Sequence, residues 1–326
     1  MGMLTGQKIT EYYQRFNTIE VTFTKEIIQV LGLITQQIYL KCISDFWPCV
    51  VFSSSFHGAK VVVNIKSGIL DKLRQANNST SLRLCFKSAD SNSPVTFFVS
   101  ARSVGYAPYA DSKDMAVLTL QFTQRPPDDL IEIMGRLLDA NINSKKRREE
   151  RIFITAECIR KLRLLKDTAV FLQGVPRRCM LRDLSFSGAK LIMMGVAKFL
   201  VEKEAALRID FDDPRESYLI RGKFIRAELV EGRKDLIAPV ILFDEAKVPM
   251  GYKIRLNDFL NLTLRMENRG GDVSSSETSR PSEKNLKPQP APPPPEQAEP
   301  REPSPREAAP PEKTDKVREK PESEKK

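Results

Sequence analysis

Short segments rich in β-branched and aromatic residues recur in two series along this chain, and they constrain its fold more than any other feature. Each segment is long enough for one strand, and turn residues separate it from the next. The first series comprises residues 21–24, 39–43, 50–52, 61–65, 82–86, 95–99 and 116–122, and the second comprises residues 169–172, 178–181, 189–193, 206–211, 218–225 and 237–243. A mostly β fold with two small β-barrels, the second of six strands, is therefore predicted.

A few helices are expected beside the strands. Residues 9–16 and 67–75 each place apolar side chains on one face, and Ser67 can cap the second of these helices. The Pro-Pro-Asp-Asp run at residues 126–129 puts proline in a first turn and two carboxylates at the positive end of the helix dipole. This helix is expected to pack on the first barrel and to fade near residues 141–144. A last helix is expected to close the second barrel.

The composition changes abruptly near residue 269. Thirteen of the 22 prolines lie between Pro281 and Pro321, and this part of the chain has almost no aliphatic residues. Such a segment cannot bury enough apolar surface to offset its conformational entropy. Residues 269–326 are therefore predicted to form a disordered, partly polyproline-II tail, whose role the sequence leaves open.

The folded part of the chain carries the excess of positive charge. The whole chain has a formal net charge of +10, whereas residues 271–326 contain 11 Lys and Arg against 12 Asp and Glu, a net charge of −1, which leaves +11 for residues 1–270. An anionic partner is expected there. Charge alone does not distinguish a nucleic acid, a nucleotide or a membrane surface.

A basic run at residues 145–151 joins the two series of strands. It contains Arg147 and Arg151 at Arg-x-x-x-Arg spacing, with Arg148 between them. Taken alone, the run is typical of a solvated linker. Arginine, however, presents fixed forks of donors that match phosphate oxygens and the O6/N7 edge of guanine, and its guanidinium can stack on a base. The run is therefore predicted to be a flexible arm that closes over an anionic ligand.

The sequence Asp-Leu-Ser-Phe-Ser-Gly at residues 183–188 predicts a tight turn between two strands of the second series. Asp and Ser favour turns, and Gly188 can supply a positive φ angle or a close backbone approach. The same residues suit a guanine nucleotide. Asp183 can accept the N1–H and N2–H donors of guanine, Ser185 can bond to phosphate or base, and Gly188 lets a ligand approach the backbone.

Together, the two sequences resemble the signature of the PilZ family of bacterial cyclic-di-GMP receptors. That signature is Arg-x-x-x-Arg followed by Asp/Asn-x-Ser-x-x-Gly, and both parts are complete here, at residues 147–151 and 183–188. The resemblance covers roughly residues 144–265. It implies a six-stranded barrel that binds cyclic-di-GMP, without another cofactor, and in which the two spaced arginines grip guanine and phosphate. The ligand-binding residues that it implies are Arg147, Arg148, Arg151, Asp183, Ser185 and Gly188.

The first half of the chain resembles, in architecture, the PilZ-like N-terminal domains of two-domain receptors of the PlzA type. It has no second set of the two motifs, so no dinucleotide site is expected in the first barrel. The expected divisions are residues 1–142 for this N-terminal domain, 143–151 for the basic linker, 152–268 for the PilZ domain and 269–326 for the tail.

The N-terminal residues lack the apolar stretch and the cleavage site of a signal peptide. No uncharged apolar stretch approaches the ~20 residues that span a bilayer. The five cysteines are widely scattered and the single histidine is His57, so no metal site is expected. A cytoplasmic protein with reduced thiols is predicted.

These observations predict a non-catalytic receptor. Cyclic-di-GMP would bind at the junction of the two barrels and draw in the arm. Because the arm is also the linker, binding would reorient the domains and change the surface that a downstream protein partner meets. The resemblance implies motility, envelope or virulence control as outputs. The sequence neither chooses among them nor identifies the partner.

Three other functions stay open. An enzyme is disfavoured because the hydrolase, zinc-protease, Walker and Rossmann motifs are missing, and His57 is best explained as an ordinary loop residue. A barrel that binds single-stranded nucleic acid needs exposed aromatic residues between Lys and Arg. Here the aromatic residues, such as Phe97 and Phe98, lie in apolar runs typical of a core. A non-catalytic scaffold with a degenerate PilZ domain is disfavoured because every signature position is filled.

Overall fold

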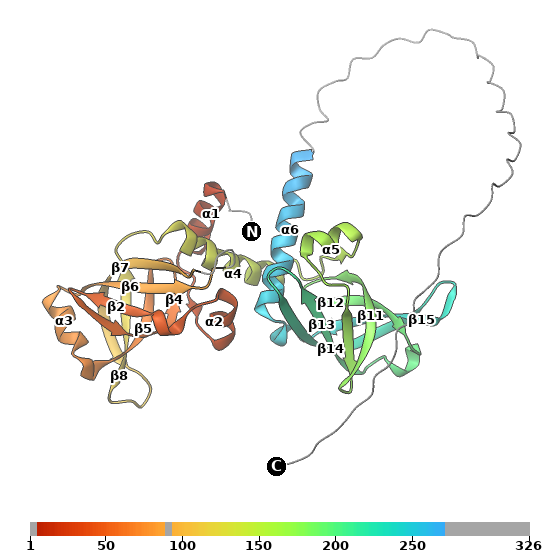
Figure 1. Ribbon diagram of the computed structural model, residues 1–326, viewed down its shortest axis with the longest axis horizontal. Helices are drawn as coiled ribbons and strands as arrows, with labels where there is room; N and C mark the ends of the chain where they lie inside the picture. Colours follow the sequence, from red (N-terminus) through yellow and green to blue (C-terminus); the bar gives the residue numbers. More distant parts are fainter. Residues whose placement is uncertain (1–4, 89–92, 271–326) are drawn as a thin grey trace, which may run out of the picture. The chain divides into compact units, whose positions relative to one another are not determined.

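The computed structural model describes residues 5–88 and 93–270, and these residues form two antiparallel β-sheets with six α-helices (Figure 1). The mostly β fold expected from the two series of strands is confirmed. The predicted tail lies outside the described residues from residue 271 onward. None of the described helices combines the length and the apolar character that crossing a membrane requires.

The first half of the structure covers residues 5–146. Its elements are α1 (Gly6–Phe16), β1 (Val21–Thr22), α2 (Lys25–Leu31), η1 (Thr35–Gln37), β2 (Tyr39–Cys42), β3 (Asp45–Pro48), β4 (Val50–Ser54), β5 (Gly58–Asn64), η2 (Ile65–Ser67), α3 (Ile69–Gln75), β6 (Ser79–Phe86), β7 (Val95–Pro108), β8 (Met115–Phe122) and α4 (Asp128–Lys146). The strand order is β1-β4-β5-β8-β7-β6-β2-β3. Only Cys49 separates β3 from β4, and its backbone N–H donates to the Ile38 carbonyl at 3.2 Å. The two strands are thus one long, interrupted strand, and the sheet curls back on itself.

The second half covers residues 152–270. Its elements are β9 (Ile152–Phe153), α5 (Ala156–Leu162), β10 (Thr168–Leu172), β11 (Val175–Leu184), β12 (Gly188–Met194), η3 (Ala197–Phe199), β13 (Glu204–Phe211), β14 (Glu216–Val230), β15 (Arg233–Phe243), η4 (Glu245–Lys247) and α6 (Met250–Gly270). The strand order is β10-β13-β14-β15-β12-β11-β9, and β10 also pairs with β11. This pairing closes the predicted six-stranded barrel. Its core includes the fully buried Val170, Leu207, Ile220, Phe224 and Ile241.

The two halves repeat one local design. The hairpin turns before β5 and β12 carry the sequences Ser-Phe-His-Gly-Ala-Lys and Ser-Phe-Ser-Gly-Ala-Lys. In each half, a seven-residue helix capped by a threonine hydroxyl follows the first, two-residue strand. Thr24 accepts the N–H of Ile27 at 3.3 Å at α2, and Thr155 accepts the N–H of Cys158 at 3.2 Å at α5. Neither helix was predicted from the sequence.

Helix α4 corrects the expectation that it fades near residues 141–144, because it continues to Lys146. Two features explain the longer helix. Lys145 and Lys146 lie in the last turn, at the negative end of the helix dipole. Asn143 is buried and donates from Nδ2 to Oδ1 of Asn257 on α6 at 2.8 Å. The basic run therefore begins inside a helix, and its irregular part starts at Arg147.

Helix α6 contributes to both cores. Its Met250 and Ile254 pack against the core of the first half, whereas Tyr252, Leu256 and Leu260 are buried in the core of the second half. The same helix contacts α4. A single helix thereby links the packing of the curled first sheet and of the closed second barrel.

One expectation about the core is wrong. Phe97 is buried, as its apolar run suggests, but Phe98 points outward and its side chain is 53% exposed. The reason is the strand period, since neighbouring residues of β7 face opposite sides of the sheet. The aromatic residues of this half are therefore not confined to the core.

Candidate functional site

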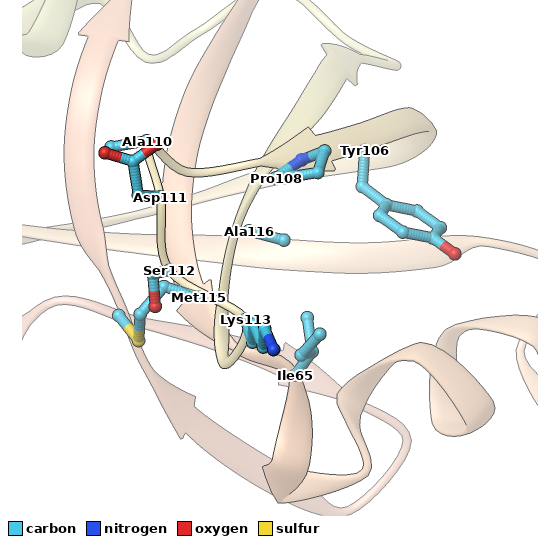
Figure 2. A pocket seen from close by; sticks show the side chains of 9 residues that line it. All are labelled: Ile65, Tyr106, Pro108, Ala110, Asp111, Ser112, Lys113, Met115 and Ala116. Carbon is cyan, nitrogen blue, oxygen red and sulfur yellow. The ribbon is translucent and has the colours of Figure 1, made fainter.

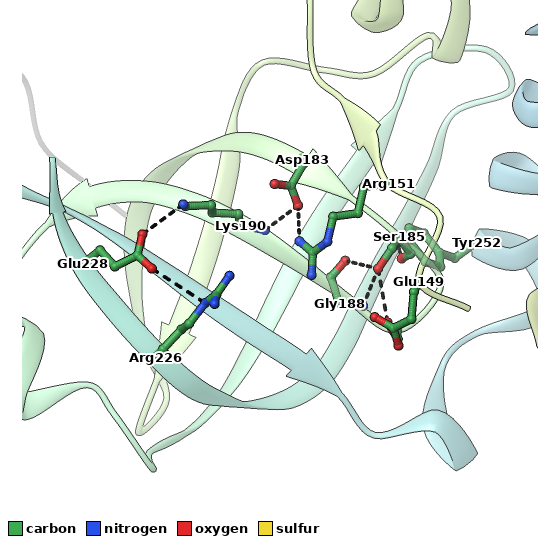
Figure 3. A network of polar contacts seen from close by, with 10 residues as sticks. Glu149, Arg151, Asp183, Ser185, Gly188, Lys190, Arg226, Glu228 and Tyr252 are labelled. Atoms are coloured by element: carbon green, nitrogen blue, oxygen red, sulfur yellow. Dashed lines mark hydrogen bonds and ion pairs between the residues drawn. The ribbon is translucent and has the colours of Figure 1, made fainter. Parts of the chain in front are cut away.

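The arm and the turn at residues 183–188 meet through an ion pair. Arg151 immediately precedes β9, which pairs with the end of β11, where Asp183 lies. Nη1 of Arg151 donates to Oδ1 of Asp183 at 2.7 Å (Figure 3). The same oxygen accepts the backbone N–H of Lys190 at 3.2 Å. Asp183 is only 4% exposed, so this carboxylate orients the arginine from inside the barrel wall.

Ser185 shapes the turn from the inside. It is fully buried, and its hydroxyl accepts the N–H of Gly188 at 3.0 Å, while its own N–H donates to the Gly188 carbonyl at 2.8 Å. The phenol of Tyr252 on α6 donates to the Ser185 carbonyl at 2.8 Å. In this structure, the bonds of Ser185 hold the turn in shape. The motif serine thus acts on the backbone conformation here.

Gly188 supplies a close backbone approach, and its φ angle is not positive. A Cβ atom at this position would fall on the carbonyl oxygen of Ile241 in β15. Gly58 lies in the equivalent turn of the first half and meets the Leu120 carbonyl in the same way. The glycine is therefore required by the barrel itself, whatever ligand approaches it.

Arg147 follows the last turn of α4 and interacts with α6 and with the arm. Its Nη1 lies 3.5 Å from Oδ1 of Asn261, and its Nε lies 3.7 Å from a carboxylate oxygen of Glu150. Within the described residues, no hydrogen bond or ion pair joins it to Asp183 or to the turn. The structure thus brings only one arginine of the spaced pair to the turn.

Arg148 interacts with two acidic residues. Its Nε lies 3.4 Å from Glu149, and its Nη1 lies 3.1 Å from Glu245 in η4. Glu149 in turn accepts a hydrogen bond from the hydroxyl of Ser187, with 3.3 Å between the two oxygens. Arg148 therefore reaches the turn indirectly, through the neighbouring carboxylate.

Several residues around the site were not predicted. Lys190 lies opposite Asp183 in the β11–β12 ladder, and its Nζ is 3.1 Å from Glu228 on β14. This contact, together with Arg226, lowers the pKa of Glu228. Figure 3 shows Arg226, Lys190 and Glu228 on the same side of the barrel as Arg151. The signal that could have identified Lys190 is the strand period, since it faces the same side as Gly188, two residues earlier.

The equivalent place in the first half has the opposite charge pattern. By strand register, Glu20 precedes β1 as Arg151 precedes β9, and Ser53 takes the position of Asp183. The Ser53 hydroxyl donates to the Glu20 carboxylate, and Lys60 pairs with Glu20 at 2.9 Å. These bonds hold the pKa of Glu20 below its ordinary value. A carboxylate where the second half has an arginine is unsuited to an anionic ligand.

A hollow of about 380 Å³ lies elsewhere, beside the β7–β8 connection of the first half (Figure 2). It is lined by Ile65, Tyr106, Pro108, Ala110, Asp111, Ser112, Lys113, Met115 and Ala116. None of the motif residues belongs to it. Among the described residues, no group of three or more His, Cys, Asp or Glu side chains is arranged to hold a metal ion.

Residues 7–141 match the PilZN3 domain family. A Treponema denticola protein named cyclic di-GMP binding protein is 43% identical over 272 residues, which cover 83% of this chain and 87% of that protein.

Two solved structures are similar over most of their length. The Borreliella burgdorferi PlzA protein in complex with c-di-GMP is 26% identical, with 78% of this chain and 99% of that chain covered and a TM-score of 0.37. YcgR from Escherichia coli, also in complex with c-di-GMP, is 13% identical, with 80% of this chain and 99% of that chain covered and a TM-score of 0.27. Given its identity to the Treponema denticola protein over most of both chains, this chain belongs to the PilZ-domain family of cyclic-di-GMP receptors, with a PilZN3 domain in its first half.

Proposed function

We propose that this protein is a non-catalytic receptor that binds cyclic-di-GMP through Arg147, Arg148, Arg151, Asp183, Ser185 and Gly188. The observation that carries the proposal is the 2.7 Å contact between Arg151 and Asp183. It joins the Arg-x-x-x-Arg arm to the Asp-x-Ser-x-x-Gly turn within the chain itself. The relative that shares 43% of its residues is named for binding this dinucleotide, which supports the same ligand here.

The proposed roles follow from the chemistry of each group. Arg151 is oriented by one bond to Asp183, so its remaining donors can reach a phosphate or the O6/N7 edge of guanine. Arg147 and Arg148 lie on the irregular part of the arm and supply further positive charge. Ser185 and Gly188 fix the turn against which the ligand rests. Asp183 accepts guanine donors only after it gives up, or shares, its bond to Arg151.

We also propose that ligand binding reorients the domains, divided as residues 1–142, 143–151 and 152–268. The arm continues directly from α4, and Arg147 lies 3.5 Å from Asn261 on α6. A ligand that draws Arg147 toward the turn removes this contact. Ligand binding can shift the protein from one domain arrangement to another only if the two arrangements differ in their affinity for the ligand. Small-angle scattering profiles that superimpose with and without cyclic-di-GMP would contradict this part of the proposal.

A competition titration tests the ligand. Labelled cyclic-di-GMP bound to the full chain is expected to be displaced by unlabelled cyclic-di-GMP and not by oligonucleotides. The Asp183→Ala variant is expected to lose discrimination against cyclic-di-AMP, because adenine lacks the N1–H and N2–H donors that a carboxylate accepts. Displacement by oligonucleotides alone, or hydrolysis of the dinucleotide, would contradict a receptor.

A single-stranded nucleic acid is a second candidate ligand, because the first half meets the criterion that it was expected to fail. On its outer face, the guanidinium of Arg83 lies 5.0 Å from the ring centre of Tyr39. Arg83 on β6 is also the register partner of the exposed Phe98 on β7. Tyr39 also contacts Phe46 edge to face at 5.1 Å, and Nζ of Lys41 lies 5.8 Å from the Phe46 ring. Exposed aromatic rings interleaved with cations are typical of surfaces that stack bases. Oligonucleotide binding that is lost on Arg83→Ala substitution would support this candidate.

A further inference from the structure

Each arginine of the arm is paired with a carboxylate of the same chain. Arg147 pairs with Glu150 at 3.7 Å, Arg148 with Glu149 at 3.4 Å, and Arg151 with Asp183 at 2.7 Å. The positive charge proposed to hold a dinucleotide is therefore already balanced in the structure. Binding of a phosphate has to replace or accommodate these internal anions.

Glu149 differs from Glu150, its neighbour on the arm, because it also bonds to the turn at residues 183–188. It lies on the arm, next to Arg148, and its Oε1 accepts the hydroxyl hydrogen of Ser187 at 3.3 Å. Ser187 is buried inside the turn at residues 183–188, where its hydroxyl also lies 3.3 Å from that of Ser185. Within the described residues, Glu150 makes no bond to this turn. Glu149 is thus the carboxylate of the arm that bonds to the turn, beside the pair that Arg151 forms with Asp183.

The position of Glu149 is the one that a bound phosphate would compete for. A ligand that touches both the arginines and the turn has to enter the space that this side chain bridges. Its own negative charge would then lie a few ångströms from that of the carboxylate, and like charges at that separation repel. The side chain of Glu149 is 72% exposed, so it can swing into solvent without disturbing the core.

We propose that Glu149 is a built-in competitor of the ligand phosphate, and that it weakens the affinity of the site for cyclic-di-GMP. The inference rests on the proposed function. Binding exchanges one anion for another, so Arg148 keeps a negative partner in both states. The residue at position 149 then sets how much ligand is needed for occupancy, even though the motif leaves the identity of this residue free.

The Glu149→Gln variant tests this inference by isothermal titration of the full chain with cyclic-di-GMP. Glutamine keeps the shape and the hydrogen bond to Ser187 but removes the charge. At about 50 mM salt, we expect roughly three- to tenfold tighter binding, the size expected for removing one like charge at an exposed site. At about 500 mM salt the gain is expected to shrink below about twofold, because the Debye length falls to about 4 Å.

Glu157→Gln provides the matched control. Glu157 lies on α5, is exposed, and pairs with Lys161 at 2.7 Å. Its substitution therefore removes the same charge at a site away from the turn. Its affinity is expected to stay within about twofold of the unmodified chain. An unchanged or weaker affinity of Glu149→Gln, an equal gain in the control, or a gain that persists at high salt would overturn the inference. Failure of the unmodified chain to bind would instead overturn the proposed function.

Discussion

At the scale of single residues, the pair of Arg151 and Asp183 decides how the candidate site is held. The carboxylate is nearly inaccessible, whereas the side chain of the arginine is 33% exposed. A charge taken out of water needs its partner, and removing one member leaves the other uncompensated. The pair therefore contributes to the folded structure as well as to the proposed ligand contact.

Substitution of Arg151 by alanine is expected to destabilise the ligand-free protein by about 1–2 kcal/mol, less than the cost of breaking a fully buried pair because the arginine is partly solvated. Only the Lys190 N–H would then remain on Asp183. The double substitution Arg151→Ala/Asp183→Asn is expected to recover part of this loss. Urea unfolding monitored by circular dichroism measures both values, and equal stability of the Arg151→Ala and unmodified proteins would show that the pair is not structural.

Two thiols are expected to be unreactive for a related reason. Burial raises the pKa of Cys49 and of Cys179 to about 12, so both stay protonated at pH 8. Cys158 packs against the second core but is only partly buried, so it is more exposed than the other four cysteines. Because the thiolate is the species that reacts, we expect iodoacetamide to modify Cys158 first. Peptide mapping by mass spectrometry measures the order, and early modification of Cys179 would contradict the closed barrel.

At the scale of elements, the β11–β12 hairpin is held by its neighbours on three sides. Tyr252 of α6 bonds to the Ser185 carbonyl, β9 pairs with Asp183, and the Ile241 carbonyl of β15 lies against Gly188. The turn of the motif is thus a fixed platform. Any movement on ligand binding is expected in the arm rather than in this hairpin.

Gly188→Ala is expected to destabilise the protein by about 1–3 kcal/mol, because the added methyl group has to displace backbone rather than a side chain. Gly105→Ala is the matched control, since a Cβ atom at Gly105 in β7 meets nothing within 4 Å and its φ angle is not positive. Thermal melting compares the two variants. Equal melting temperatures would contradict the close approach of β15 to the turn.

The same elements show which parts of the fold sequence patterns can predict. Segments rich in β-branched and aromatic residues identified the strands except β3 and β9, and the motif spacing placed the turn between β11 and β12. The length of α4 was missed, because the contact between Asn143 and Asn257 that favours its last turns joins helices far apart in sequence. The outward direction of Phe98 was missed because an apolar run does not reveal which of two neighbours faces the core.

The candidate site itself could be predicted only in part. Arg151 and Asp183 belong to the motifs and do meet. The bond of Arg147 to Asn261 and the bridge from Glu149 to Ser187 depend on tertiary placement, which no local pattern encodes. Sequence spacing therefore predicted candidate residues, and packing decides which of them are joined within the chain.

At the scale of the whole molecule, a buried polar network joins α4 to α6. Asp139 is 1% exposed, and its Oδ2 accepts from Asn257 at 3.0 Å and from Asn261 at 3.1 Å. Its other oxygen pairs with Arg15 of α1 at 3.3 Å. Since Asn261 also contacts Arg147, the network runs from the centre of the helix contact to the first arginine of the arm.

Asp139→Ala is expected to lower the stability of the protein by about 2–4 kcal/mol, because the buried amide of Asn257, the partly buried amide of Asn261 and a guanidinium lose their common acceptor. Asp71→Ala is the control, since Asp71 is exposed on α3 and pairs within its own helix, with Arg74 at 3.2 Å. Chemical unfolding measures both. A loss below about 0.5 kcal/mol for Asp139→Ala, the range of ordinary surface substitutions, would show that the network does not secure the contact between the helices.

The most direct test of the proposed receptor is a calorimetric titration of the full chain with cyclic-di-GMP, repeated with the Arg147→Ala/Arg151→Ala variant after its folding has been verified. We expect saturable binding to the unmodified chain and at least about a hundredfold weaker binding to the variant, because two charge-assisted contacts are lost. No binding to the unmodified chain, or equal affinity of the two proteins, would contradict a dinucleotide site built from the arm and the turn.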